Sequence, residues 1–189
     1  TAKAAHIIRK ERPNLEISID SNAAVKLVPT SAKDVTVDYA DTLYDVSVEN
    51  ENGDWKVDIS YIGSYSKYTS AGLHIPDNAF GEIGIHVDEA TLYFNSVFRY
   101  GETINAKISD YASIFYTVPS GFQGTLNMTA PDCYLELYSD DGYKNCDVTI
   151  SNGSTFGDIA DGFTKRGNRF VYSDGTKAGV LNIDLGSGG

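Results

Sequence analysis

The sequence predicts an all-β fold in which short strands stack into a β-solenoid-like or β-sandwich-like single domain. Apolar and polar residues alternate over much of the chain, which is the pattern of strands with one buried and one solvated face. The composition agrees, because 13 tyrosines and a hydrophobic fraction of 41% suit pleated sheets around a core. A third observation is an internal repeat in the second half of the chain.

Alternation is clearest between residues 15 and 61, where five short strands are predicted. The alternating apolar positions are Leu15, Ile17 and Ile19; Val25 and Leu27; Val35, Val37 and Tyr39; Tyr44, Val46 and Val48; and Trp55, Val57, Ile59 and Tyr61. Asn52-Gly53 lies between the last two runs, and this dipeptide is the strongest short signal of a hairpin. We therefore expect a hairpin over residues 46–59. Residues 2–10 fit either a helical turn or a strand.

The composition changes at Ser64, where a short polar stretch rich in Tyr and Ser begins. We place a boundary there and expect an N-terminal β subregion at 1–63 and a repeat-containing β subregion at 64–189. Because the polar stretch is short, it is typical of a loop rather than a disordered linker. The two subregions are therefore expected to form one continuous domain.

An aliphatic residue followed by proline occurs at Ile75-Pro76 and at Val118-Pro119, 43 residues apart. Apolar residues at equal distances from the two prolines define matched inward positions. These are Ile83, Ile85, Leu92 and Phe94 in the first unit, and Leu126, Met128, Leu135 and Leu137 in the second. Each unit is expected to end a strand at the proline and then to add two strands, so that stacked units share one core. A third, looser unit is expected over residues 146–185.

The two cysteines, Cys133 and Cys146, leave two alternatives open. In a parallel stack that advances 13 residues per step, they would lie on neighbouring strands about 4.8 Å apart, within reach of a disulfide bond. In an antiparallel hairpin they would lie far apart. A free buried cysteine is also common as a small core residue. A Cys133–Cys146 disulfide would therefore favour the stacked arrangement.

The charge balance is 15 basic against 26 acidic residues, a formal net charge of -11. Nucleic acids and anionic membrane surfaces would repel such a chain unless it carried a basic stripe. The densest basic groups are Arg9, Lys10 and Arg12, and Lys165, Arg166 and Arg169, and each lies among acidic and polar residues. We expect no nucleic-acid partner. No apolar run reaches the roughly 20 residues of a membrane helix, so direct membrane insertion by this segment is not expected.

The sequence contains no nucleophile elbow, no phosphate-binding glycine loop and no dinucleotide fingerprint. His74 and His86 lie between aliphatic residues and are expected to point outward, whereas zinc needs three or four converging ligands. The acidic pairs lie in expected turns, where Asp bonds the local backbone. These pairs are Asp140 with Asp141, Asp88 with Glu89, and Asp158 with Asp161. We expect no catalytic residue, no metal and no cofactor.

Calcium is a better alternative than zinc, because it prefers oxygen ligands from acidic loops. The segments 139–142 (Ser-Asp-Asp-Gly) and 173–175 (Ser-Asp-Gly) are rich in oxygen atoms, but neither matches the twelve-residue calcium loop. Solvated hairpin turns are the favoured interpretation of both segments, and calcium binding is the alternative.

Tyr61, Tyr65 and Tyr68 cluster in and beside the polar stretch, and further tyrosines follow at Tyr93, Tyr100, Tyr111 and Tyr116. An exposed tyrosine offers a flat contact area with one hydrogen-bonding end, which suits a sugar face or a protein partner. Tyr61, Tyr65 and Tyr68 are therefore candidates for ligand binding. The alternative is that the rings cover sheet edges or fill the space between the subregions.

The segments Leu15–Ile19, Val25–Leu27 and Val35–Tyr39, the aliphatic-Pro units and the closing Leu185–Gly188 together resemble a family of bacterial adhesin domains of unknown function. That family is related to the head domains of surface adhesins. The resemblance covers most of residues 15–189 and implies a β stack exposed on a cell surface. It transfers no catalytic residue.

We therefore expect a non-catalytic structural or adhesive module that meets an unknown protein or glycan at the cell surface. The localisation expected is extracellular or cell-surface, with anchoring by a segment outside this sequence. A carbohydrate-binding module that uses the tyrosine cluster is the alternative. A polysaccharide-active β-helix enzyme that uses one of the acidic pairs is the third.

Overall fold

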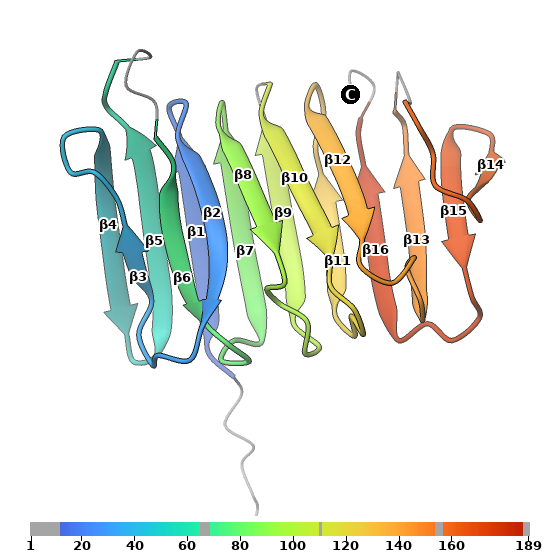
Figure 1. Ribbon diagram of the computed structural model, residues 1–189, viewed down its shortest axis with the longest axis horizontal. Coiled ribbons are helices and arrows are strands. Elements are labelled where there is room, and N and C mark those ends of the chain that lie inside the picture. The colour runs from blue at the N-terminus through green and yellow to red at the C-terminus, as the bar shows by residue number, and fades with distance from the viewer. Residues whose placement is uncertain (1–11, 65–68, 110, 154–156, 187–189) are drawn as a thin grey trace, which may run out of the picture.

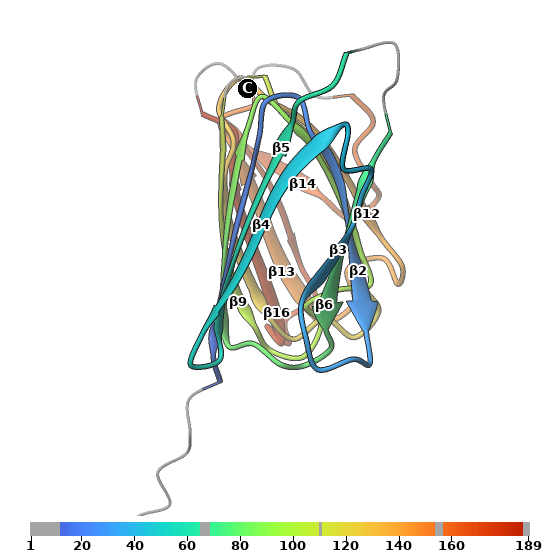
Figure 2. The same ribbon diagram turned by 90° about the vertical axis from the view of Figure 1, so that its left-hand side faces the viewer.

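The computed structural model describes residues 12–64, 69–109, 111–153 and 157–186, which form two facing β-sheets (Figures 1 and 2). Sheet A has ten strands and sheet B has six in this part of the chain, where no helix occurs. Apolar side chains from the two inner faces meet in one continuous core between the sheets. The prediction of an all-β, single-domain stack is confirmed.

The spatial order of the strands in each sheet differs from their order in the sequence. From one edge to the other, sheet A consists of β4 (Tyr44–Glu51), β5 (Asp54–Tyr61), β1 (Asn14–Asp20), β7 (Glu82–Asp88), β9 (Thr103–Ser109), β11 (Thr125–Thr129), β16 (Gly179–Asp184), β13 (Cys146–Ser151), β15 (Arg169–Ser173) and β14 (Thr164–Arg166). Sheet B consists of β3 (Thr36–Asp38), β6 (Ala71–Pro76), β2 (Ala24–Thr30), β8 (Thr91–Asn95), β10 (Ser113–Val118) and β12 (Tyr134–Ser139).

From β7 to β12 the chain alternates between the two sheets, and from β9 on each strand pairs in parallel with the strand one pass earlier. In sheet A, Ile104 lies between Ile83 and Leu126 in one inward row. In sheet B, Ile114 lies in the same way between Leu92 and Leu135. The 43-residue offset therefore spans two passes and four strands. The expected unit of three strands is wrong in this detail, because the intervening pass lacks the aliphatic-Pro signal.

A common corner turns the chain from sheet A to sheet B at four places. A residue with positive φ is followed by a small residue at the corner of the core, at Asn22-Ala23, Glu89-Ala90, Tyr111-Ala112 and Asp132-Cys133. The corners stack through backbone hydrogen bonds, as where the Tyr134 N–H donates to the Ala112 carbonyl at 3.0 Å. Cys133 thus occupies the place that alanine takes in the earlier passes.

The chain does not stack strictly in sequence order. β1 lies between β5 and β7, and β2 lies between β6 and β8, so the first strands are inserted among later ones. At the other end, β16 lies between β11 and β13. Strands from residues 1–63 and from residues 64–189 therefore belong to the same two sheets.

Antiparallel strands close both ends of the parallel stack. At one end β4 pairs with β5 and β3 pairs with β6, and at the other β15 pairs with β13 and β14 with β15. The predicted hairpin over residues 46–59 is confirmed, with Asn52 and Gly53 at φ 55° and 96°. Both residues have the left-handed backbone that Asn-Gly adopts in two-residue hairpin turns.

The core and the outer face of sheet A show why the parallel register is stable. The residues predicted to point inward on β7, β8 and β11 are buried, and those on β12 are half-buried because that strand ends sheet B. On the outer face, the Asn127 amide donates to Asn105, and the Asn182 amide donates to Asn127, each at 3.1 Å. This ladder satisfies amides that in-register strands bring one above another.

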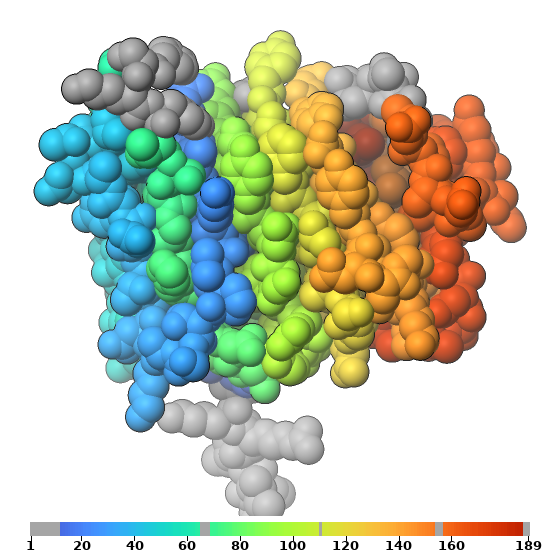
Figure 3. Space-filling view, viewed as in Figure 1, coloured from blue at the N-terminus to red at the C-terminus, as the bar shows by residue number. Residues whose placement is uncertain are grey.

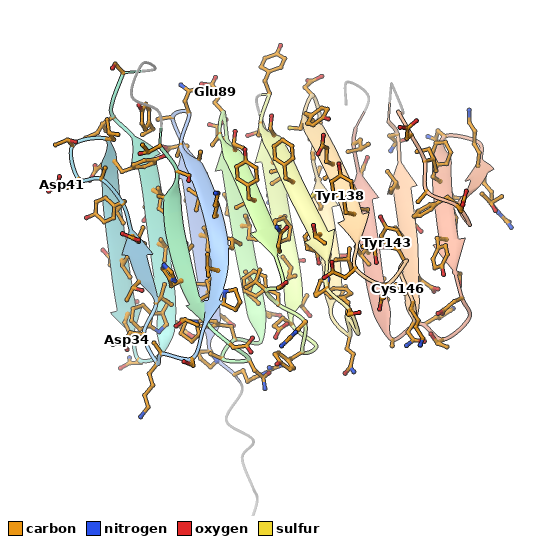
Figure 4. The ribbon with its side chains drawn as sticks, viewed as in Figure 1. Asp34, Asp41, Glu89, Tyr138, Tyr143 and Cys146 are labelled. Carbon is orange, nitrogen blue, oxygen red and sulfur yellow. The ribbon has the colours of Figure 1, made fainter. Side chains whose placement is uncertain are left out.

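Cys133 and Cys146 are not joined by a disulfide, so the disulfide alternative is wrong. The 13-residue step fails because Cys133 lies at the corner before β12 of sheet B, whereas Cys146 begins β13 of sheet A. Burial raises the pKa of the Cys146 thiol to about 11, so it stays protonated at neutral pH. The stacked arrangement nevertheless holds, as the parallel registers show. Figure 4 marks Cys146 close to Tyr143, whose ring packs at the end of the core.

Candidate functional site

The outer face of sheet B carries aromatic side chains in a row that crosses the strands. In-register pairing places Lys26 of β2, Tyr93 of β8, Phe115 of β10 and Glu136 of β12 beside one another, with Gly72 of β6 next to Lys26. These residues alternate with the buried positions on each strand and therefore point away from the core. The face is turned toward the viewer in Figure 3.

The rings of the row pack on one another. Tyr93 and Phe115 stack with centroids 4.8 Å apart and planes 12° apart, and Tyr134 follows 6.0 Å from Phe115. Glu136 orders the end of the row, because the hydroxyls of Tyr134 and Tyr138 donate to its two carboxylate oxygens at 2.5 and 3.0 Å. Side chains fixed in this way lose little conformational entropy when a ligand binds.

A shallow groove of about 680 Å³ runs along β2 on this face. Its lining includes Lys26, Val28, Ser70, Tyr93 and Asn95. One face of the Tyr93 ring is covered by Phe115, so its other face borders the groove on the β2 side. The volume is within the range of about 300–1,000 Å³ that small-molecule sites occupy.

Lys26 gives the groove its charge. The side chain is exposed and, within the described residues, forms no ion pair. The hydroxyl of Ser70 and the amide of Asn95 add uncharged hydrogen-bonding groups. The groove thus offers an aromatic wall, one ammonium group and neutral polar groups, an arrangement that can hold a polar ligand with an apolar face.

The tyrosines proposed from sequence occupy different environments. Tyr61 is only 7% exposed, packs edge-on against Tyr44 at 5.3 Å and donates its hydroxyl to the Ser64 carbonyl at 2.5 Å. The expectation of an exposed ring at Tyr61 is therefore corrected, because that position faces the core on β5. Tyr65 and Tyr68 lie outside the described residues. Tyr116 is buried in the core, whereas Tyr100 and Tyr111 are exposed in corner loops.

The histidines point outward, as expected, but from opposite sheets. His74 lies on β6 of sheet B, and exposed His86 lies on β7 of sheet A. They therefore cannot share one metal ion. Across the described ranges, no three His, Cys, Asp or Glu side chains are grouped so that they could hold one.

The acidic turns use their carboxylates to fix the local backbone. Asp141 accepts hydrogen bonds from the Ser139 hydroxyl at 3.1 Å, the Gly121 N–H at 3.1 Å and the Lys144 N–H at 3.2 Å. The hydroxyl and N–H of Thr176 donate to Asp174, and these bonds lower the pKa of that carboxyl. Both turns proposed as calcium loops are built by these contacts.

Glu102 is 2% exposed and lies at a corner of the core. Its carboxylate accepts the Tyr100 N–H at 3.0 Å. Burial is the main cause that raises its pKa, and Asp77 adds to the rise, whereas the hydrogen bond from Tyr100 and the charge of Arg12 oppose it. Sequence alone did not single out this residue.

Glu102→Gln is expected to change how stability depends on pH. The pKa of the Glu102 carboxyl is higher in the folded state than its value of about 4.3 in the unfolded state, so the folded state binds its proton more tightly. The stability that this proton contributes is fully present below the unfolded pKa and is lost as the pH rises through the folded pKa. The free energy of unfolding of Glu102→Gln, relative to that of the wild type, should therefore be highest at neutral pH. This difference should shrink as the pH falls from 7 to 4. Urea unfolding at several pH values measures the difference. A difference that stays constant over this range would contradict the raised pKa.

The aromatic row was missed because its members are far apart in sequence and do not form a cluster. The signal was present, however, because Tyr93, Phe115 and Glu136 follow one another at the spacing of single passes. About half of the 43-residue offset is the spacing that relates Tyr93 to Phe115 and Phe115 to Glu136.

No family model matches the chain, and no curated protein matches it. One solved structure that resembles it is described as a "putative cell adhesion protein" from Clostridium sporogenes ATCC 15579. The likeness has a TM-score of 0.55 at 12% identity and covers 94% of this chain and 91% of that chain. At this identity the likeness shows a shared fold. No helix in the described ranges is both long enough and apolar enough to cross a membrane.

Proposed function

We propose that the chain is a non-catalytic adhesive module of a bacterial cell-envelope protein, which meets its ligand through the outer face of sheet B. The fold it shares with a protein described as a "putative cell adhesion protein" supports this class of function. So does the architecture, in which two facing sheets form a slab whose broad outer faces, including that of sheet B, are open to a partner (Figure 2).

The observation that carries the proposal is the groove beside Tyr93. Its aromatic wall is held in place by the stack on Phe115, and Lys26 in its lining has no ionic partner among the described residues. Exposed aromatic rings beside free polar groups are typical of recognition surfaces.

A carbohydrate is the ligand that the groove fits best. The apolar face of a sugar ring can pack on Tyr93, while its hydroxyls bond with Ser70 and Asn95. The Lys26 ammonium favours a sugar that carries a carboxylate. This reading keeps the carbohydrate-binding alternative but moves it from the tyrosines near Ser64 to the outer face of β2 and β8.

A polysaccharide-cleaving enzyme is supported less well. The described lining of the groove contains no Asp or Glu, whereas glycoside hydrolysis requires two facing carboxyl groups. Incubation with polysaccharides and an assay for new reducing ends tests this reading. We expect no release, and release by the wild type would show that the chain is an enzyme.

Tyr93→Ala is expected to weaken glycan binding about tenfold or more, because the variant loses the aromatic wall. A glycan array that includes acidic and neutral saccharides identifies the ligand, and titration calorimetry measures the affinity. Tyr111→Ala is the matched control, since Tyr111 is 84% exposed at a corner outside the groove and should bind as wild type does.

Two results would count against the proposal. If no saccharide on the array binds, the carbohydrate reading fails and a protein ligand must be sought. If a ligand is found and Tyr93→Ala binds it as tightly as Tyr111→Ala does, the groove is not the site. Thermal melting of both variants verifies that they are folded.

A further inference from the structure

The two edge strands of sheet A carry opposite charges. At one end the free edge is β4, whose outward residues include Asp45, Glu49 and Glu51, all exposed. At the other end the free edge is β14, and the β14–β15 hairpin carries exposed Lys165, Arg166 and Arg169. The acidic end also includes Asp34 and Asp41, which lie near the loops beside β3 and β4 (Figure 4).

Each end includes one pair of like charges in directly opposed positions, although Glu49 of β4 lies opposite Lys56 of β5. Glu51 pairs with Asp54 across β4 and β5, and Arg166 pairs with Arg169 across β14 and β15. Like charges in directly opposed positions destabilise a strand pair. In the described part of the chain, Arg166 and Arg169 form no ion pair, and neither does Glu51. Each end would therefore be stabilised by a partner of opposite charge.

The strand directions allow a second copy to supply that partner. β14 is antiparallel to β15 and therefore runs in the same direction as β13 and β5, whereas β4 runs opposite to β5. A second copy in the same orientation would place its β4 antiparallel to β14. Both edges already pair in this way with their own neighbours.

The register across sheet A aligns the charges. The row of directly paired residues that contains Arg166 and Arg169 passes through Ser151 and Ser18 and ends at Ser47 on β4. In a copy added in register, Arg166 would therefore lie opposite Ser47. Asp45 and Glu49 flank Ser47 on the same face, because side chains two residues apart share a side of a strand.

We propose that a second copy of this chain associates head to tail, with the basic β14–β15 hairpin against the acidic β4 edge, so that sheet A continues from one copy into the next. Such an interface is heterologous and can add further copies in an open chain. It leaves the outer face of sheet B free, so it would present the Tyr93 grooves in a line.

Sedimentation velocity of the purified protein over a range of concentrations tests the association. The weight-average sedimentation coefficient should rise with concentration at about 50 mM NaCl. The apparent dissociation constant should increase about tenfold or more at about 500 mM NaCl, because salt screens exposed charges. A wild type that stays monomeric at low salt and high concentration would overturn the proposal, and so would an association that salt does not weaken.

Charge reversal separates this interface from any other. R166E/R169E gives two acidic ends and D45K/E49K gives two basic ends, so each variant alone should lose association by about 100-fold or more, since like charges meet. An equimolar mixture should associate again, because opposite ends are restored. Association of either variant alone at the wild-type level, or a mixture that remains monomeric, would overturn the proposal. Circular dichroism verifies that each variant is folded, and glycan titration of these variants tests the groove separately.

Discussion

Ile104→Asp is expected to unfold the protein, because it places an unpaired charge in the middle of the core. Ile104 is fully buried and lies in the inward row between Ile83 and Leu126. A charge buried there without a partner costs more than about 4 kcal/mol, a large part of the roughly 5–15 kcal/mol by which a domain is stable. Ile83→Asp and Leu126→Asp should behave alike, since all three residues occupy equivalent places.

His86→Asp is the matched control for this substitution. His86 lies on β7 next to Ile85, but it points outward and is exposed. The change should alter the free energy of unfolding by about 0.5 kcal/mol or less. Circular dichroism and urea titration measure both variants. If Ile104→Asp unfolds at the same urea concentration as the wild type, Ile104 does not lie in the core. Its assignment to the inward row between Ile83 and Leu126 would then be wrong.

Tyr116 should respond in opposite directions to two substitutions. Its ring is 1% exposed and stacks on Phe94 with centroids 3.9 Å apart. Its hydroxyl has no hydrogen-bond partner among the described residues, and burial raises its pKa. Tyr116→Ala removes the ring and should cost about 3–5 kcal/mol. Tyr116→Phe removes only the unsatisfied hydroxyl and should stabilise the protein by about 1 kcal/mol.

Chemical denaturation of the two Tyr116 variants measures both effects. The comparison is informative because the variants share one position and differ only in whether the ring is kept. Loss of stability in Tyr116→Phe would mean that the hydroxyl makes a contact that stabilises the fold. A small effect of Tyr116→Ala would mean that the stack on Phe94, within sheet B, contributes little to the stability of the core.

Local signals in the sequence were sufficient to predict many of the strands, although not β9 or β14. The alternation of Leu15, Ile17 and Ile19 reports one buried face, and Asn52-Gly53 reports a two-residue turn, so both could be read from neighbours in the chain. The offset between Pro76 and Pro119 likewise pointed to stacked passes. It indicated twice the true spacing, because only every second pass begins with an aliphatic-Pro pair.

The order of the strands depends on contacts between distant residues and could not be predicted. Nothing near β1 indicates that it lies between β5 and β7. The disulfide alternative for Cys133 and Cys146 failed for the same reason, because consecutive strands belong to different sheets. Tyr61 was assigned to a surface from the polar residues that follow it, although its place in the alternation of β5 already indicated the core.

The groove could not be inferred from composition, since it depends on the register of β2 against β8. Lys26 and Tyr93 are adjacent only because these strands pair in parallel. Gly72, which is next to Lys26 on β6, adds no side chain to the row. The residues that make the candidate site are thus ordinary outward positions that the fold brings together.

The most direct test of the proposed binding face is a map of the bound ligand on the protein surface by nuclear magnetic resonance. The ligand is the saccharide selected by the array, and the readout is the change in backbone amide chemical shifts during titration. We predict that the largest changes fall on the outward residues of β2 and β8, at Lys26, Val28, Tyr93 and Asn95. Changes confined to the outer face of sheet A, or to the β4 and β14 ends, would contradict the central claim.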